Sequence, residues 1–316
     1  MTEGPSSGAS PAEDSLIHVA LLYRTPEGYG SQLEAFVRGA RAAAEPVLAV
    51  LPSGGLATAQ RACGEHADAV RWTAMEDVAR NPSRLLSLYS DWITEHSGRV
   101  RIVGEPVWPG RGRSEAVECL RHEALVNHEL AAAPVSLLCP YDAGQLDAEI
   151  LTGAAMTHPW LIDDHGQRRE SPDFADPLAV ATGRHWPLEE PVPPISEHPF
   201  SGDLGSLRRA VAQDPHAAAL GSRRSDLVLA VSEAASNALK HADGTCVMRL
   251  WSTGAEVISE VWTRSTIRDA FAGRRRPPWD AEDGRGLWLI NQVCDLVELR
   301  SGGEETILRM HLSCPA

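Results

Sequence analysis

Two short motifs near the C-terminus combine residue types that bind and activate phosphorylated ligands. Glu233 and Asn237 are four residues apart in a stretch of helical periodicity, so their side chains share one face of the helix. A carboxylate at such a position can act as a general base, and an amide oxygen is a ligand for a hard cation such as Mg²⁺. Gly284-Arg285-Gly286 precedes another apolar helix, whose first backbone N–H groups can bind phosphate oxygens. Together the motifs indicate a nucleotide pocket.

A structural role for the two polar residues is the alternative. Glu233 would then cap the helix or form an ion pair on a solvated face. Asn237 argues against this alternative, because an asparagine within an apolar helix adds little to helix stability. We therefore favour a binding role for the pair.

Length and composition limit the class of protein. The chain has 316 residues, which is enough for two domains with substantial cores. No apolar run approaches the roughly 20 residues that cross a membrane. Residues 1–15 lack the basic start and apolar core of a signal peptide and read as a disordered tail. The cysteines are scattered without a C-x-x-C pair, as in proteins with reduced thiols. We expect a cytoplasmic protein that does not contact a membrane.

The net charge of −14 is unevenly distributed, since almost all of it lies in the first 200 residues. DNA binding relies on lysine and arginine at the phosphate backbone, so an acidic domain is poorly suited to it. We expect no direct DNA binding. Acidity alone is more typical of a soluble surface than of a basic partner.

Residues 16–162 alternate between strand-like and helix-like segments. Strands are predicted at residues 17–23, 47–51, 69–72, 100–103 and 135–139. Helices are predicted at residues 31–44, 56–63, 82–96, 114–130 and 145–156. This repeat predicts an α/β domain with a parallel sheet covered on both faces, whose ligands bind at the C-terminal ends of the strands. Residues 23–31, after the first strand, lack the G-x-x-x-x-G-K-[ST] motif of a P-loop.

Four short motifs in this region carry a family resemblance. They are Val103-Gly104-Glu105-Pro106-Val107-Trp108-Pro109-Gly110, Glu115-x-x-Glu118-Cys119-x-x-His122-Glu123, Leu138-Cys139-Pro140-Tyr141-Asp142 and Thr157-His158-Pro159. Together they resemble the DcmR-like MEDS sensory domain, a degenerate relative of RecA-like P-loop domains. The resemblance implies a RecA-like fold with a degenerate P-loop and a sensory role at residues 16–162.

The polar residues of these motifs leave three alternatives open. A buried metal site is conceivable, with Glu115, Glu118, Cys119 and His122 along one helix face and Cys139, Asp142 and His158 approaching from strand ends. However, no pair has a dedicated metal spacing such as C-x-x-C or H-E-x-x-H. A sensory pocket without a metal is favoured over it, with Glu105, Trp108, His122 and His158 binding a small molecule. A structural or partner-binding domain is the third and broadest alternative.

The rest of the chain divides into a linker and a second domain. Residues 163–199 are rich in proline and have little periodicity, which is typical of an extended, stiff linker. Part of this segment could instead pack on the first domain. Residues 200–316 predict helices at 204–212, 226–241 and 287–294, and strands at 246–251, 257–262, 296–300 and 306–312. Helices on one face of a largely antiparallel sheet form an α+β sandwich.

This order of elements, with Glu233 and Asn237 on the second helix and Gly284-Arg285-Gly286 before the third, resembles the Bergerat-type ATPase domain of GHKL proteins. Within that group it is most similar to the RsbW-like anti-sigma-factor serine kinases. With the MEDS-like region added, the chain resembles the RsbA-type anti-sigma regulators.

The resemblance implies a role for each matching residue. Glu233 would deprotonate a serine or threonine of a partner, and Asn237 would hold Mg²⁺. Gly284 and Gly286 would bind the phosphates of ATP, with Arg285 as an additional cation. The partner would be a sigma factor, an anti-anti-sigma (STAS) protein or both, and a homodimer is conceivable.

A basic segment at residues 268–278 would form the lid over the nucleotide. The consecutive arginines 274–276 could contact a triphosphate or a partner protein. A run of arginines beside prolines is, however, more typical of a mobile, hydrated loop.

The sequence departs from the family where the adenine base is recognised. Relatives carry an aspartate there, followed two residues later by a glycine, whereas this chain has Thr263 and Ser265. A hydroxyl is a weaker acceptor than a carboxylate, and Ser265 adds a side chain where the backbone should approach the purine. Asp269 is too far along the chain to substitute. We therefore predict weakened or absent ATP binding.

Two functions stay open. One is a non-catalytic regulator whose ATPase fold is a docking surface controlled by the sensory domain. The other is an active anti-sigma serine/threonine kinase. Glu233 and Asn237 favour the kinase, and Thr263 favours the non-catalytic regulator, which we prefer.

Overall fold

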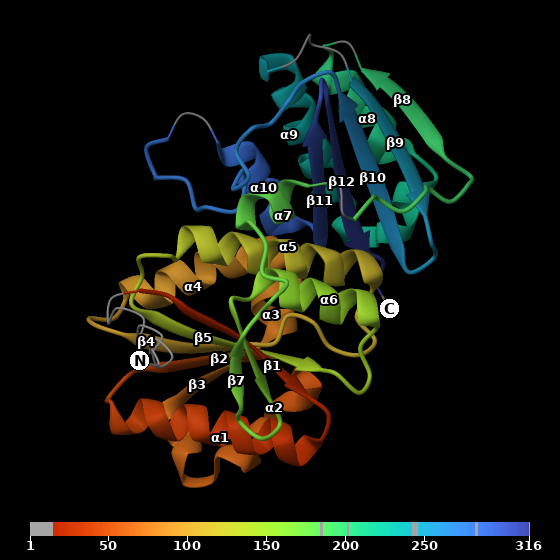
Figure 1. The fold of residues 1–316 in the computed structure, drawn as a ribbon. Helices are drawn as coiled ribbons and strands as arrows, with labels where there is room; N and C mark the ends of the chain where they lie inside the picture. The colour runs from red at the N-terminus through yellow and green to blue at the C-terminus, as the bar shows by residue number, and fades with distance from the viewer. Residues whose placement is uncertain (1–14, 184–185, 201, 242–245, 282–283, 316) are drawn as a thin grey trace.

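The structure is a computed structural model that describes residues 15–183, 186–200, 202–241, 246–281 and 284–315 (Figure 1). The predicted tail, apart from Ser15, lies outside the described residues. No helix in these ranges has the length and apolar character that crossing a membrane requires.

The N-terminal part contains the larger sheet. Its strands are β1 (Ile17–Tyr23), β2 (Val47–Leu51), β3 (Val70–Ala74), β4 (Val100–Gly104), β5 (Val135–Asp142), β6 (Trp160–Asp163) and β7 (Arg168–Glu170). Its helices are α1 (Pro26–Ala42), α2 (Ser53–Cys63), α3 (Met75–Ala79), α4 (Leu85–Thr94), α5 (Arg113–Glu129), α6 (Ala148–Thr157) and α7 (Pro177–Thr182), with 3-10 turns η1 (Gly64–Ala69) and η2 (Pro82–Arg84).

This sheet has the order β3-β2-β4-β5-β1-β6-β7 and is parallel except for the β6–β7 pair. Strands β2 and β5 are buried along their whole length, which is typical of strands in a parallel sheet covered on both faces. Val19 and Leu21 of β1 pack into the core under α1 and α2, whereas Ala20 packs into the core under α4, α5 and α6. Figure 1 shows these two helical layers on opposite faces of the sheet. The predicted parallel α/β architecture is therefore confirmed.

The C-terminal part contains the smaller sheet. Its strands are β8 (Ser196–Phe200), β9 (Cys246–Ser252), β10 (Glu256–Thr263), β11 (Leu296–Gly302) and β12 (Glu305–Ser313). Its helices are α8 (Leu204–Gln213), α9 (Arg224–His241) and α10 (Arg285–Val293), with a 3-10 segment η3 (His216–Arg223).

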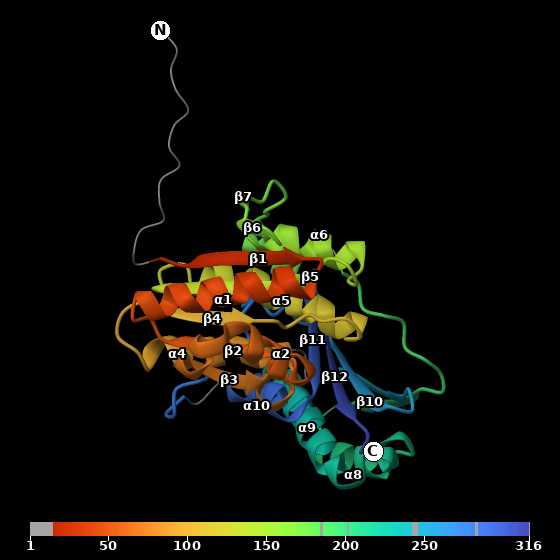
Figure 2. The same ribbon diagram turned by 90° about the horizontal axis from the view of Figure 1, so that it is seen from below.

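The smaller sheet is antiparallel, with the order β11-β12-β10-β9-β8. One face carries the helices, because Leu227, Val231 and Ala235 of α9 form an apolar stripe that packs on strand residues such as Met248 and Met310. This arrangement agrees with the predicted sandwich of helices and an antiparallel sheet. Figure 2 shows the C-terminal part extending beyond the larger sheet.

The segment predicted as a linker contains regular structure. Helix α7 begins with Pro177 in its first turn, and Asp176 caps it by accepting a hydrogen bond from the N–H of Ala179 (2.7 Å). Val180 and Ala181 of this helix are buried in the core beside α5. Strand β8 pairs with β9. The segment therefore contributes a helix to the first part and a paired strand to the second.

His311 joins three strands of the smaller sheet. It lies in β12, and its ring nitrogens contact Oε2 of Glu256 in β10 (3.1 Å) and Oε2 of Glu298 in β11 (3.0 Å). Burial alone would lower the pKa of His311, but the hydrogen bonds and charges of the two glutamates raise it to about 9. The imidazolium is thus the form that the folded state stabilises.

We predict that this histidine makes stability depend on pH. Because the pKa is raised above the unfolded value, the stabilisation is complete below about pH 6.5 and is lost as the pH rises through about 9. His311→Gln should lower the free energy of unfolding at pH 6 by an amount on the order of 3 kcal/mol, and the deficit should shrink towards pH 10. Urea denaturation at several pH values measures this, with the exposed His165→Gln as the control. A deficit that does not change with pH contradicts the assignment.

Candidate nucleotide-binding site

The structure brings together the residues of the two C-terminal motifs. Glu233 and Asn237 lie on the same face of α9, and Gly286 lies against them in the first turn of α10. A Cβ atom built on Gly286 would lie 3.1 Å from Oε2 of Glu233 and 3.2 Å from Nδ2 of Asn237. A larger residue at position 286 would therefore displace both side chains.

The start of α10 has the conformation that its glycines allow. Gly284 caps the helix with φ of 85°, in the left-handed region that favours glycine. Arg285, which we predicted as a cation for phosphate, donates a hydrogen bond from Nη2 to the carbonyl oxygen of Trp279. Its guanidinium is therefore engaged with the polypeptide that precedes the helix.

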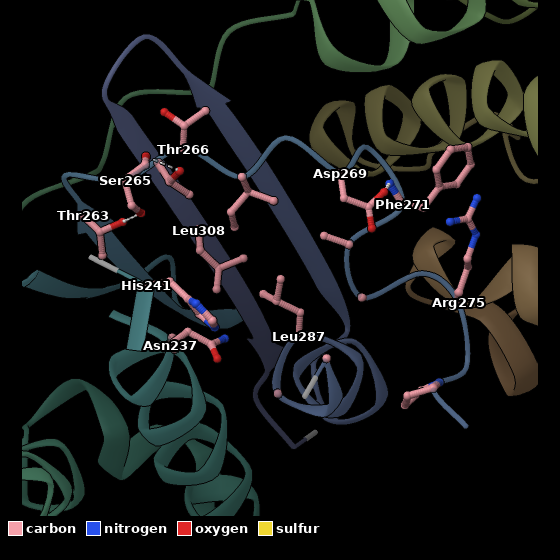
Figure 3. Close-up of a pocket in the computed structure, with 18 of the residues that line it drawn as sticks. Asn237, His241, Thr263, Ser265, Thr266, Asp269, Phe271, Arg275, Leu287 and Leu308 are labelled. Carbon is pink, nitrogen blue, oxygen red and sulfur yellow. Dashed lines mark hydrogen bonds between the residues drawn. The ribbon is translucent and has the colours of Figure 1, made fainter. Parts of the chain in front are cut away.

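A cavity of about 690 Å³ opens beside these residues. Its volume lies within the usual range for small-molecule sites. Figure 3 shows Asn237 and His241 of α9 pointing into it, with Thr263 and Ser265 at the end of β10. Gly284, Gly286 and part of the 268–278 segment complete the lining. The predicted nucleotide-binding residues Asn237, Thr263, Gly284 and Gly286 thus share one cavity.

The part of the cavity near β10 offers hydroxyl groups in place of a carboxylate. Oγ1 of Thr263 lies 3.0 Å from Oγ of Ser265, and Oγ1 of Thr306 donates to the carbonyl oxygen of Ser265 (2.8 Å). Asp269 is the only carboxylate among the described lining residues, and its Oδ1 accepts the N–H of Phe271 (2.9 Å). Figure 3 shows Asp269 well away from Thr263. The described residues around the cavity therefore provide glycines at one end and, near β10, neutral hydroxyl groups where a carboxylate was the alternative.

The 268–278 segment, which we call the lid, is bound to the N-terminal part. Arg274 is only 7% exposed, and its Nη2 donates to Oε2 of Glu118 in α5 (3.0 Å). The other oxygen of Glu118 accepts a hydrogen bond from Nη1 of Arg300 in β11 (2.6 Å). Burial alone would raise the pKa of Glu118, but Arg121, Arg300 and Arg274 hold it below its usual value.

Two further arginines and an aromatic ring extend this contact. Nε of Arg275 donates to Oε1 of Glu129 (2.7 Å), and Nη2 of Arg276 donates to Oδ2 of Asp91 in α4 (2.9 Å). Phe271 is buried in the core of the N-terminal part. The prediction of a hydrated loop was therefore wrong for Arg274, because the acidic N-terminal part supplies the partners of the arginine run.

The C-terminal end of α10 is also held by the N-terminal part. Nε of Arg84 donates to the carbonyl oxygen of Asn291 (2.9 Å), and Nδ2 of Asn81 donates to the side-chain oxygen of the same residue (3.0 Å). Carbonyl groups in the last turn of a helix have no partner within the helix, and a cation there also interacts favourably with the helix dipole. The glycine end of α10 thus faces the cavity, while its other end is anchored in the neighbouring domain.

The four residues predicted as a sensory pocket have separate partners. Glu105 is buried, accepts hydrogen bonds from Tyr23 (3.3 Å) and Tyr29 (3.4 Å), and has its pKa raised to about 8 by burial. Trp108 stacks under Arg111, and His122 is buried beside Tyr89. His158 is buried beside His18.

A protein-family model matches each of the two parts of the chain. The model of the MEthanogen/methylotroph, DcmR Sensory domain (MEDS) matches residues 17–159. The model of the histidine kinase-like ATPase domain matches residues 201–312. No curated protein matches the chain.

We predict that Glu118 holds the lid in place. Glu118→Gln leaves the buried Arg274 without a counter-charge and leaves the partly buried Arg300 only the more distant Glu298, and breaking a buried ion pair costs about 3–5 kcal/mol. Trypsin should therefore cleave the chain after Arg274 and Arg275 at least ten-fold faster than in the wild-type protein, as followed by mass spectrometry.

Two further variants make the lid experiment specific. Glu149→Gln removes a partly exposed ion pair with Arg113 on the same domain and should leave the cleavage rate unchanged. Glu129→Gln removes the ion pair with Arg275, which is about half exposed. It should increase cleavage without leaving a buried arginine unpaired. Equal cleavage of all three variants, with unchanged circular dichroism, contradicts the role of Glu118.

Proposed function

The chain joins an N-terminal MEDS domain to a C-terminal histidine kinase-like ATPase domain, and on this premise we propose that it regulates sigma-factor-dependent transcription as an anti-sigma-type protein. In this function the ATPase-fold domain binds protein partners, and the MEDS domain responds to a small molecule or a partner. The single observation that supports regulation is the docking of the lid on α4 and α5 of the MEDS domain, and the anti-sigma role rests on the resemblance.

The lid offers a direct route from the sensory domain to the nucleotide cavity. Its residues Phe271, Gly273 and Arg275 line the cavity, while Phe271 and Arg275 also contact the MEDS domain. A ligand that shifts α5 therefore changes the position of the lid, provided that it binds one position of α5 more tightly than the other. By linkage, a partner that binds the lid changes the affinity of the MEDS domain for its ligand by the same factor.

The partner classes follow from the resemblance to RsbW-like and RsbA-type proteins. They are a sigma factor, an anti-anti-sigma (STAS) protein, or both. The resemblance also implies a RecA-like fold with a degenerate P-loop for the MEDS domain. The loop after β1 contains no lysine, which agrees with a degenerate P-loop.

ATP binding is weakened or absent in this proposal. Gly284, Gly286 and Asn237 suit the phosphates and their Mg²⁺, but Thr263 offers the adenine amino group a neutral hydroxyl that is already within 3.0 Å of Ser265. Hydrogen bonds to charged groups contribute about 1.5–3 kcal/mol, compared with about 1 kcal/mol for neutral ones.

An active serine/threonine kinase is the second candidate function, and the contact of Gly286 with Glu233 and Asn237 favours it. Glu233 would accept the proton of a partner hydroxyl. Asn237 would hold Mg²⁺, which neutralises phosphate charge when ATP is bound. The two candidates share the regulatory role and differ in whether phosphate is transferred.

We predict that a carboxylate at position 263 restores nucleotide affinity. Calorimetry with Mg·ATP should detect affinity weaker than micromolar for the wild-type chain. Thr263→Asp should strengthen binding by about ten-fold or more, as expected for a charged acceptor. Thr266→Asp adds the same charge at an exposed position elsewhere in the cavity lining and is the matched control for position 263. Micromolar affinity of the wild-type chain supports the kinase instead.

A pull-down from the native host tests the regulatory role itself. We expect the tagged chain to recover a sigma factor or a STAS protein, with equal yield in the presence and absence of ATP. Labelled phosphate on the recovered protein would establish the kinase. Recovery of neither class of partner contradicts both candidate functions.

A further inference from the structure

Four side chains of complementary chemistry converge inside the MEDS domain. They are His18 of β1, Glu123 of α5, Cys139 of β5 and His158, which directly follows α6. Each is at most 1% exposed, and the four ligand atoms all lie within 4.8 Å of one another. Residues from four separate elements thus present two imidazoles, a thiol and a carboxylate to one buried point.

Four separations between these atoms are close to those of a tetrahedral metal site. Nε2 of His18 lies 3.0 Å from Oε2 of Glu123 and 3.5 Å from Sγ of Cys139. Oε2 of Glu123 lies 3.5 Å from the same sulfur and 3.7 Å from Nε2 of His158. Metal bonds of about 2.0–2.3 Å at tetrahedral angles place neighbouring ligand atoms about 3.3–3.6 Å apart.

The hydrogen bonds of the two imidazoles orient their other nitrogen towards this point. Nδ2 of Asn127 donates to the carbonyl oxygen of Thr157 (2.6 Å), so its Oδ1 is the acceptor that faces Nδ1 of His18 (2.9 Å). Nδ1 of His158 donates to the carbonyl oxygen of Ala154 (2.8 Å). Each neutral ring therefore carries a lone pair on Nε2, the tautomer of a metal-binding histidine.

These lone pairs face a carboxylate that is itself an acceptor. Nε2 of His158 and Oε1 of Glu123 have no hydrogen-bond partner among the described residues, although both atoms are buried. A proton between His18 and Glu123 satisfies that pair and leaves His158 without a partner. A single cation at the centre satisfies all four groups, because each then offers it an electron pair.

We propose that His18, Glu123, Cys139 and His158 bind one Zn²⁺ ion in a closed tetrahedral site. Two imidazoles, one thiolate and one carboxylate are ligands that Zn²⁺ commonly takes. The thiolate and the carboxylate together balance the charge of the ion, which suits a site that excludes water. On binding, the sulfur–metal bond replaces the S–H bond of Cys139, and the proton is released to solvent.

The site connects the sheet to the helix that holds the lid. Glu123 lies between Glu118 and Glu129 on α5, and these two residues bind Arg274 and Arg275. The ion therefore fixes α5 relative to β1 and β5. This consequence rests on the proposed function, whereas metal binding itself does not.

Metal analysis of the full chain, purified without chelators, tests the site. Inductively coupled plasma mass spectrometry should find about one zinc per chain in the wild-type protein and at least ten-fold less in Cys139→Ala and in His158→Ala. Cys63→Ala removes another buried cysteine of the same domain and should keep its zinc. Asn127→Leu should weaken zinc affinity about 10–100-fold in a competition titration, since it removes the group that orients His18.

A spectroscopic measurement decides the case if the variants do not fold. Wild-type protein stripped of metal and titrated with Co²⁺ should develop a thiolate-to-cobalt charge-transfer band and the intense visible absorption of tetrahedral cobalt. Wild-type protein that contains no metal and gives no such spectrum overturns the proposal. Folded Cys139→Ala protein with a full equivalent of zinc also overturns it.

Tryptic cleavage of the metal-free protein tests whether zinc binding affects the lid. Removal of zinc should increase tryptic cleavage after Arg274 and Arg275. If zinc binds and cleavage does not change, the coupling fails while the metal site stands. If partner binding fails in the pull-down, the function fails while the metal site again stands.

Discussion

The carboxylate of Glu118 is buried among the guanidinium groups of Arg121, Arg274 and Arg300, and the connection between the two domains depends on it. Glu298 is a second carboxylate 3.7 Å from Arg300, so three cations share two anions and the cluster needs Glu118 in its ionised form. Through Arg274 it positions the lid, and through Arg300 it positions β11, so the cavity wall and the smaller sheet share a common contact in α5.

Part of the uneven charge of the chain lies at the contact between the two domains. The N-terminal part carries almost all of the net negative charge. Glu118, Glu129 and Asp91 face arginines of the ATPase domain. Charge complementarity of this kind sets the register between two surfaces more than it adds affinity. The MEDS domain thus has the electrostatic character of a partner for the lid.

Local patterns predicted most of the elements, because apolar periodicity and proline or glycine punctuation depend on neighbouring residues alone. The β/α alternation before residue 162 and the spacing of Glu233 and Asn237 are examples. Short strands such as β7 and β8 escaped prediction, since they are stabilised by pairing with distant segments. The same limit applies to His18 and Glu123. A histidine within the apolar strand at residues 17–23 was the available signal, but its partners lie more than a hundred residues away.

Phe271 has a consequence for how the two domains relate as folding units. It belongs to the ATPase domain by sequence and to the core of the MEDS domain by packing. Together with the anchoring of α10 by Arg84, this means that the ATPase domain on its own would present an apolar ring and bare helix carbonyls to water. Separating the two domains would therefore expose groups that their contact covers, and we expect the folding of one domain to be coupled to the other.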